Sequence, residues 1–185
     1  MTIMLFSLDT TGLLRFDRPA SDETQPRLVA MACAMFNSKW EQKGYFEFIT
    51  KPDGVASQAE AKSIHGVTER ERELYGVDHL FLMAAFMRFV RLSGEVATFN
   101  MPFAAKMLEI EFDRLKALNT DWIRGGLKRT CIRDEAGARW NNGKPMNIQA
   151  AHEAATGIAY AKPAKDKHVK DVRAAARIVM ELRRK

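Results

Sequence analysis

Three segments near the start of the chain carry the hydrophobic pattern of β-strands. They are Ile3–Leu8, Leu28–Phe36 and Tyr45–Thr50, and turn-forming residues, including a polar loop from Pro19 to Pro26, separate them. Short apolar or alternating runs with such boundaries are typical of strands. Three consecutive strands predict an antiparallel start to a mixed sheet.

The rest of the chain alternates between helical and strand patterns. In Val77–Leu92 the apolar side chains recur at helical spacing, which predicts an amphipathic helix. The other predicted elements are a short helix at Ala59–Ile64, a strand at Val96–Phe99, a helix at Phe103–Leu118, an extended segment at Leu127–Ile132, an irregular Gly-rich and Asn-rich stretch to Lys144, and helices at Ile148–Thr156 and Val169–Leu182. This order predicts an α/β fold in which helices cover both faces of a mixed sheet.

Composition adds the class of protein. The 185 residues are 46% hydrophobic and 28% charged, which predicts one globular domain over residues 1–185. No run of 18 apolar residues and no signal-peptide pattern is present, so we expect no membrane contact. Cys33 and Cys131 are too few for a disulfide framework, and we expect buried thiols in a reducing cytoplasm.

The net charge of +6 arises at one end of the chain. Between Lys162 and Lys185 nine basic residues stand against three acidic ones, and the remaining 20 basic and 20 acidic residues cancel. A basic terminal helix suits contact with nucleic-acid phosphates. A solvated helix face explains the same charges equally well.

The segment Phe6–Leu13 reads Phe-Ser-Leu-Asp-Thr-Thr-Gly-Leu. It resembles the first motif of the DEDDh (DnaQ-like) 3′-5′ exonucleases, which have a ribonuclease H-like fold, where an apolar strand carries Asp-x-Glu before Thr-Thr-Gly-Leu. Residues two apart in a strand face the same way, so both carboxylates of that motif reach one pair of Mg²⁺ or Mn²⁺ ions. Here Asp9 stands at the Glu position, and Ser7 stands at the Asp position.

Two internal segments resemble further parts of the same family. Ile64–Thr68 is similar to an Ile-His-Gly-Ile-Thr segment that lies near the bound 3′ nucleotide, although a structural role in a turn explains His65 equally well. Phe99–Ala104 resembles the second motif, whose Asp helps to hold the second metal. That position is Ala104, while Phe103 is expected to pack in the core.

The segment Asp166–Ala175 resembles the closing motif, which supplies a metal-binding Asp and a general-base His. Asp171 falls on the metal position. The position of the base holds Asp166, and His168 lies only three residues before Asp171. Asn147–Ile158 resembles the helix that precedes this motif, so the resemblance covers nearly the whole chain.

The resemblance therefore implies a degenerate catalytic site. Its five positions are Ser7, Asp9, Ala104, Asp166 and Asp171. Asp9 and Asp171 could hold one weakly bound Mg²⁺ or Mn²⁺ ion, and otherwise we expect no cofactor. An engineered substitution would explain Ala104 alone, whereas Ser7 and Asp166 favour natural loss.

We hypothesise an exonuclease-fold protein with little or no catalysis that binds nucleic-acid ends or a protein partner. The alternative is an active metal-dependent 3′-5′ exonuclease on single-stranded DNA or RNA. A homodimer is a further possibility. Methionines such as Met83, Met87, Met101 and Met107 would offer adaptable surface to a protein if exposed, although a core role is commoner. The expected nucleic-acid contacts are Thr10, Thr11, Gly12, Leu13, His65, Asn100, Lys167, His168, Lys170 and Arg173.

Overall fold

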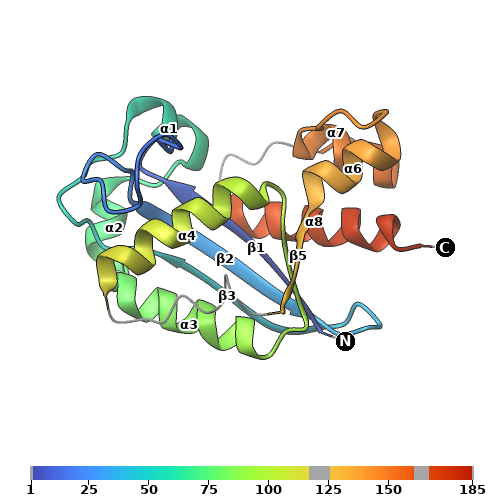
Figure 1. Cartoon of the computed structure of the whole chain (residues 1–185), viewed down its shortest axis with the longest axis horizontal. Helices are drawn as coiled ribbons and strands as arrows, with labels where there is room; N and C mark the ends of the chain where they lie inside the picture. Colours follow the sequence, from blue (N-terminus) through green and yellow to red (C-terminus); the bar gives the residue numbers. More distant parts are fainter. Residues whose placement is uncertain (1, 117–125, 161–166, 185) are drawn as a thin grey trace.

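A five-stranded mixed sheet forms the centre of the molecule, with the strand order β3-β2-β1-β4-β5 (Figure 1). The computed structural model describes residues 2–116, 126–160 and 167–184. The strands are β1 (Ile3–Thr10), β2 (Leu28–Phe36), β3 (Gln42–Ile49), β4 (Glu95–Thr98) and β5 (Lys128–Cys131).

The first three strands are antiparallel neighbours, and the last two extend the sheet in parallel. β1 pairs antiparallel with β2 on one side and parallel with β4 on the other. β2 pairs antiparallel with β3, and β4 pairs parallel with β5. The predicted antiparallel start to a mixed sheet is confirmed.

Helices cover both faces of the sheet, as predicted. One core joins Met4, Phe6 and Leu8 of β1 to α3 and α4, and the other joins Ile3 and Leu5 of β1 to α6, α7 and α8. In Figure 1, α4 crosses in front of the strands and α8 lies behind them. The helices are α1 (Ala59–His65), α2 (Glu69–Tyr75), α3 (His79–Arg91), α4 (Met101–Leu115), α6 (Ile132–Trp140), α7 (Ile148–Thr156) and α8 (Lys167–Leu182).

Small side chains set how α8 meets the sheet. The strands present Ala32, Ala34 and Ala97 to this helix, and α8 contributes Ala175 and Ala176 to the same core. Small residues on both sides let a helix pack closely while keeping interior density. The backbone of α8 therefore lies close to β1, the strand that carries Ser7 and Asp9.

Two helices differ from the prediction. Helix α2 was not predicted, and the stretch from 132 to 140, predicted to be irregular, is helix α6. The other elements agree to within about three residues, except that the end predicted for the helix from Phe103 lies outside the described residues. The predicted single domain stays a prediction.

Three further expectations concern composition. Cys33 is buried as expected, whereas Cys131 is only half-buried, and both are free thiols. Met83, Met87, Met101 and Met107 all lie in the core, so they offer no exposed surface to a protein partner. None of the described helices is long and apolar enough to cross a membrane.

Candidate functional site

Strand β1 brings Ser7 and Asp9 to the α8 side of the sheet. Side chains alternate along a strand, and Ile3 and Leu5 of β1 belong to the core under α8. Ser7 and Asp9 continue this series, and both are half-buried near the end of the strand. This strand therefore supplies one carboxylate where the exonuclease motif supplies two.

The turn after β1 is fixed by backbone and side-chain hydrogen bonds. The hydroxyl of Thr10 donates to the Gly12 carbonyl at 2.6 Å, and the Thr11 amide donates to the Arg27 carbonyl at 2.8 Å. The Gln58 amide donates to the Thr11 carbonyl at 2.7 Å. A Cβ atom at Gly12 would lie 2.7 Å from the Gln58 side chain, so position 12 has room only for glycine unless Gln58 moves.

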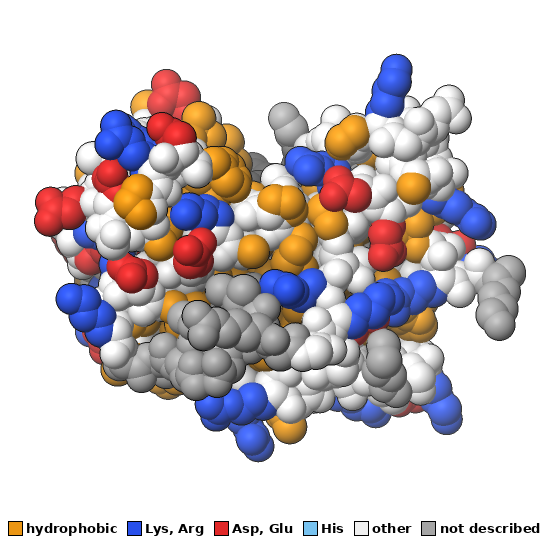
Figure 2. All heavy atoms as spheres, in the orientation of Figure 1, with side chains coloured by type: hydrophobic (Ala, Val, Ile, Leu, Met, Phe, Trp, Pro, Cys, Tyr) orange, Lys and Arg blue, Asp and Glu red, His pale blue; other side chains and the backbone are white. Residues whose placement is uncertain are grey.

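An apolar pocket of about 430 Å³ opens beside this turn. Asp9 is part of its wall, and Leu13 and Ile64 are strongly exposed there. Figure 2 shows hydrophobic side chains gathered beside α1. The residues that line the pocket are Leu8, Asp9, Thr10, Gly12, Leu13, Gln58, Glu60, Ala61, Ile64, His65 and Phe103.

A smaller polar pocket of about 140 Å³ lies next to the first one. Gly12, Leu13 and Gln58 line both pockets, so these three residues form the wall between them. The loop on the other side of the polar pocket is folded around the buried side chain of Gln25, whose amide nitrogen donates to the Arg15 carbonyl at 2.8 Å.

His65 combines the two roles that the sequence left open. It ends α1, it is buried, and its Nδ1 accepts a hydrogen bond of 3.0 Å from the Val67 amide. The same ring lines the apolar pocket. A bonded Nδ1 places the remaining ring proton on Nε2 when the histidine is neutral.

Helix α4 begins beside the pocket. The Asn100 side chain caps this helix by accepting a hydrogen bond from the Phe103 amide at 3.4 Å. Phe103 lines the pocket as well as packing against the core, so its predicted core role is only part of its position. Ala104 is 2% exposed, and its methyl group belongs to the core.

Asp171, the expected metal ligand on α8, is engaged by a phenol. The hydroxyl of Tyr160 donates a hydrogen bond to Oδ1 of Asp171. Burial, followed by this carboxylate, raises the pKa of Tyr160, so the phenol stays a donor. The position of Tyr160 in the sequence, beside a predicted loop, gives no signal for this contact.

The described residues do not fit a two-metal centre. Among residues 2–116, 126–160 and 167–184, no group of three or more His, Cys, Asp or Glu is arranged to hold a metal ion. The prediction for Asp166 lies outside this range, as do the side chains of Lys167, His168 and Lys170. Arg173 is described and exposed.

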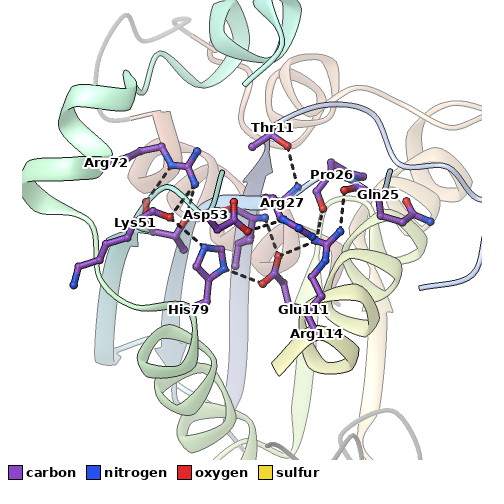
Figure 3. Close-up of polar contacts among 12 residues, drawn as sticks. Thr11, Gln25, Pro26, Arg27, Lys51, Asp53, Arg72, His79, Glu111 and Arg114 are labelled. Carbon is purple, nitrogen blue, oxygen red and sulfur yellow. Dashed lines mark hydrogen bonds and ion pairs between the residues drawn. The ribbon is translucent and has the colours of Figure 1, made fainter. Parts of the chain in front are cut away.

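A polar network supports the turn; it is buried at Glu111 and exposed at Asp53 (Figure 3). Glu111 of α4 accepts a hydrogen bond from the Leu28 amide at 2.9 Å and contacts Nδ1 of His79 at 2.9 Å. Arg27 donates from its amide to the Thr11 hydroxyl at 2.9 Å, and its side chain pairs with Asp53 at 2.6 Å. The partners lie far apart in sequence, so no local pattern predicts the network.

The network changes the titration of His79. Burial of the ring lowers its pKa, but the hydrogen bond and charge of Glu111 outweigh burial, and the pKa lies above the ordinary 6.5. The other ring nitrogen, Nε2, lies 3.3 Å from the Lys51 carbonyl. Both nitrogens therefore face acceptors, which favours the doubly protonated ring.

Comparisons with known proteins show the fold. No protein-family model and no curated protein sequence matches the chain. Solved structures that match include E. coli exonuclease I with a dT13 oligonucleotide (20% identity, TM-score 0.75, 98% of this chain) and an exonuclease I from Methylocaldum szegediense (21% identity, TM-score 0.74, 97% of this chain). A third is a complex of exonuclease I with SSB-Ct (18% identity, TM-score 0.75, 97% of this chain).

These likenesses confirm the ribonuclease H-like exonuclease fold predicted from the motifs. The chain spans 40% of the length of each of these three structures. At such identities the likeness establishes the arrangement of strands and helices and leaves the chemistry to the side chains at the site.

Proposed function

We propose that this chain binds the 3′ end of a single-stranded nucleic acid and cleaves it very slowly or not at all. The observation that carries the proposal is an apolar pocket beside Asp9 with a serine at position 7 and a buried alanine at position 104. The pocket offers a place for a terminal nucleotide. The exonuclease motifs that this chain resembles carry carboxylates at these two positions, and the chain lacks both.

The chemistry of phosphodiester cleavage explains why these positions matter. Two divalent ions stabilise the attacking and leaving oxygens, and they need negatively charged oxygen ligands. Losing one electrostatic element of a catalytic site typically costs about 10²-fold to 10³-fold in rate. Such losses are not additive, but changes at three positions, Ser7, Ala104 and Asp166, should together leave little turnover. In addition, Tyr160 engages one oxygen of Asp171.

The pocket has the surface expected for a nucleoside. The Phe103 ring and the side chains of Leu13 and Ile64 can cover a base, while Thr10 and His65 offer polar atoms at the wall. Stacking of one base on an aromatic ring is worth about 1 to 3 kcal/mol and depends little on sequence. We therefore expect binding of DNA or RNA ends with little base preference.

A nuclease assay tests the proposal. Labelled single-stranded DNA and RNA are incubated with Mn²⁺ and three proteins: the unaltered chain, the double variant Ser7→Asp/Ala104→Asp, and the double variant Asp9→Asn/Asp171→Asn. We expect 3′ shortening only with the first double variant, because only that protein carries the added carboxylates. Thermal unfolding with and without Mn²⁺ checks its fold, since a carboxylate at position 104 enters the core.

The competing activity is a working exonuclease, which the fold of the matched exonuclease I structures supports. Shortening by the unaltered chain that disappears in Asp9→Asn/Asp171→Asn would establish this activity and reject our proposal. Shortening that is equal in all three proteins would identify a contaminating nuclease, which a further purification step must remove before the comparison is repeated.

A protein-interaction subunit is the second candidate function. Exposed apolar side chains at the junction of α2 and α3 favour it, namely Leu74, Tyr75, Leu80 and Phe81. This role predicts no salt-dependent affinity for oligonucleotides, in contrast to the binding of nucleic-acid ends. A cytoplasmic location and a homodimer stay predictions.

A further inference from the structure

A third pocket lies between α7 and α8, and Tyr160 forms part of its wall. Its volume is about 300 Å³. It is lined by His152, Ile158, Ala159, Tyr160, Arg173, Ala174 and Arg177. None of these residues except Arg173 was expected to bind a ligand, and the pocket shares no lining residue with the apolar pocket at Asp9.

Two guanidinium groups give this pocket its charge. Arg173 and Arg177 are four residues apart on α8, so they lie on the same side of the helix, and both are exposed. Within the described part of the chain, neither arginine forms an ion pair with a carboxylate. Arginine remains charged at any physiological pH and presents several donors that match phosphate oxygens.

The aromatic residues of the pocket are held by specific contacts. The Tyr160 hydroxyl is held by Asp171, and the ring packs edge-on against His152 with 5.6 Å between the ring centroids. His152 is 4% exposed, and its Nδ1 lies 3.2 Å from the Ile158 carbonyl. The Tyr160 ring, held through its hydroxyl and its contact with His152, therefore lines the pocket together with the exposed Ile158 and the two arginines.

We propose that this pocket binds a backbone phosphate of the same single strand, with the attached nucleoside against Tyr160 and Ile158. The inference rests on the proposed function, because it assumes a strand whose 3′ end lies near Asp9. Tyr160 links this pocket to Asp171, the expected metal position on α8, since its hydroxyl donates to Asp171 while its ring lines the pocket. Alternating anionic and planar groups are what a nucleic-acid strand presents, and an acidic peptide offers the charge without the regularly spaced rings.

A pair of double variants tests the pocket. Arg173→Gln/Arg177→Gln removes its two charges, and Arg88→Gln/Arg91→Gln removes two exposed charges from α3, across the sheet. We measure affinity for a thymidylate oligonucleotide against salt concentration, and affinity for a thymidine dinucleotide. The α8 variant is expected to bind the oligonucleotide about tenfold more weakly, with the slope of log affinity against log salt reduced by about 0.7 for each phosphate that the protein no longer neutralises. The dinucleotide should bind both variants equally.

Three results would overturn the proposal. The first is an equal loss of oligonucleotide affinity in the two double variants, and the second is an unchanged salt slope in the α8 variant. The third is a loss of dinucleotide affinity in the α8 variant as large as its loss of oligonucleotide affinity, which would place the arginines at the 3′ pocket. Both variants should unfold at nearly the temperature of the unaltered chain, because neither pair of side chains is buried, and thermal unfolding checks this.

A second measurement separates this proposal from the function on which it rests. Inorganic phosphate is titrated into the isotope-labelled protein, and amide shifts are followed at residues 152, 158–160 and 173–177. Shifts in the unaltered chain that vanish in Arg173→Gln/Arg177→Gln support the pocket even where no oligonucleotide binds and the proposed function fails. Shifts with an acidic peptide but not with phosphate would reject the phosphate assignment.

Discussion

At the scale of single residues, a few side chains that do not line the apolar pocket support the turn at Thr11. Glu111 accepts from the Leu28 amide, at the start of the strand that follows the loop, and thereby fixes where that loop ends. Arg114 donates to the carbonyls of Pro26 and Gln25 at 2.8 and 2.9 Å. Glu111 is buried, and its carboxylate is stabilised by His79, by the Leu28 amide and by Arg114, which lies 3.8 Å away.

The contact of Glu111 with His79 gives a prediction for stability against pH. The pKa of His79 is raised in the folded state, so its contribution is complete below the ordinary pKa of about 6.5 and is lost as pH rises through the folded value. We expect the difference in free energy of unfolding between the unaltered chain and His79→Asn to shrink as pH rises, in urea titrations over that range. A difference that is constant with pH would contradict the titration that we assign to His79. In a second variant, Glu111→Gln, the contribution of His79 to the free energy of unfolding should no longer depend on pH in this way.

At the scale of elements, helix α8 is anchored at the end far from Asp171. Arg183 donates two hydrogen bonds to the buried carboxylate of Glu95 on β4, one of them 2.8 Å long. Thr130 of β5 donates to the same group at 2.6 Å. Burial raises the pKa of Glu95, but these partners outweigh it and the pKa lies below its ordinary value.

Removing this anchor should destabilise the fold. Among the described residues, Arg183→Gln leaves Lys128 and Thr130 as side-chain partners of Glu95, and we expect the free energy of unfolding to fall by about 2 kcal/mol. Arg184→Gln is the matched control, because that exposed pair with Glu181 should contribute less than about 0.5 kcal/mol. Equal effects of the two changes in urea unfolding would show that the Glu95 interaction does not anchor α8.

Helices α2 and α6 were missed in the sequence analysis for two different physical reasons. The start of α2 carries a capping box, in which Thr68 and Glu71 satisfy one another's backbone amides, and this pattern was readable in the sequence. In α6, Gly137 suggested a loop. A Cβ there would lie 2.4 Å from the Lys144 carbonyl, so the glycine serves close packing of backbone against helix. That packing is tertiary and leaves no local signal.

At the scale of the whole molecule, the charge is unevenly distributed. The surplus of six positive charges belongs to the region from Lys162 onward, which leads into and includes α8. Ions released from phosphates make the affinity of such a surface for nucleic acid fall with salt. The affinity for a nucleic-acid strand should therefore depend on where the positive charges lie as well as on their number.

A triple substitution measures this asymmetry. Lys167→Gln/Lys170→Gln/Arg173→Gln is expected to reduce the salt slope for single-stranded DNA by up to about 2. Lys39→Gln/Arg88→Gln/Arg91→Gln removes the same charge from exposed positions elsewhere and should change the slope little. If both triple variants behave alike in fluorescence anisotropy titrations, then α8 has no special part in binding.

Much of the fold was predictable from the sequence, and the candidate site was only partly so. The strand with Ser7 and Asp9, and the segments with His65 and Asn100, carry their own local patterns. The hydrogen bond from Tyr160 to Asp171 joins residues 11 positions apart, and the hydrogen bond from the Leu28 amide to Glu111 joins residues 83 positions apart. Such interactions depend on how the helices pack on the sheet, which spacing in the chain does not encode.

The side chain of Gln58 separates the apolar pocket from the smaller polar pocket, and its amide end lies where a Cβ atom of residue 12 would be. A movement of that amide toward one pocket would enlarge the other pocket. A small molecule bound on the polar side would thus narrow the apolar side, where we propose that a nucleoside binds. A ligand of the polar pocket at the turn after β1 is therefore expected to weaken the proposed nucleic-acid binding without occupying the apolar pocket.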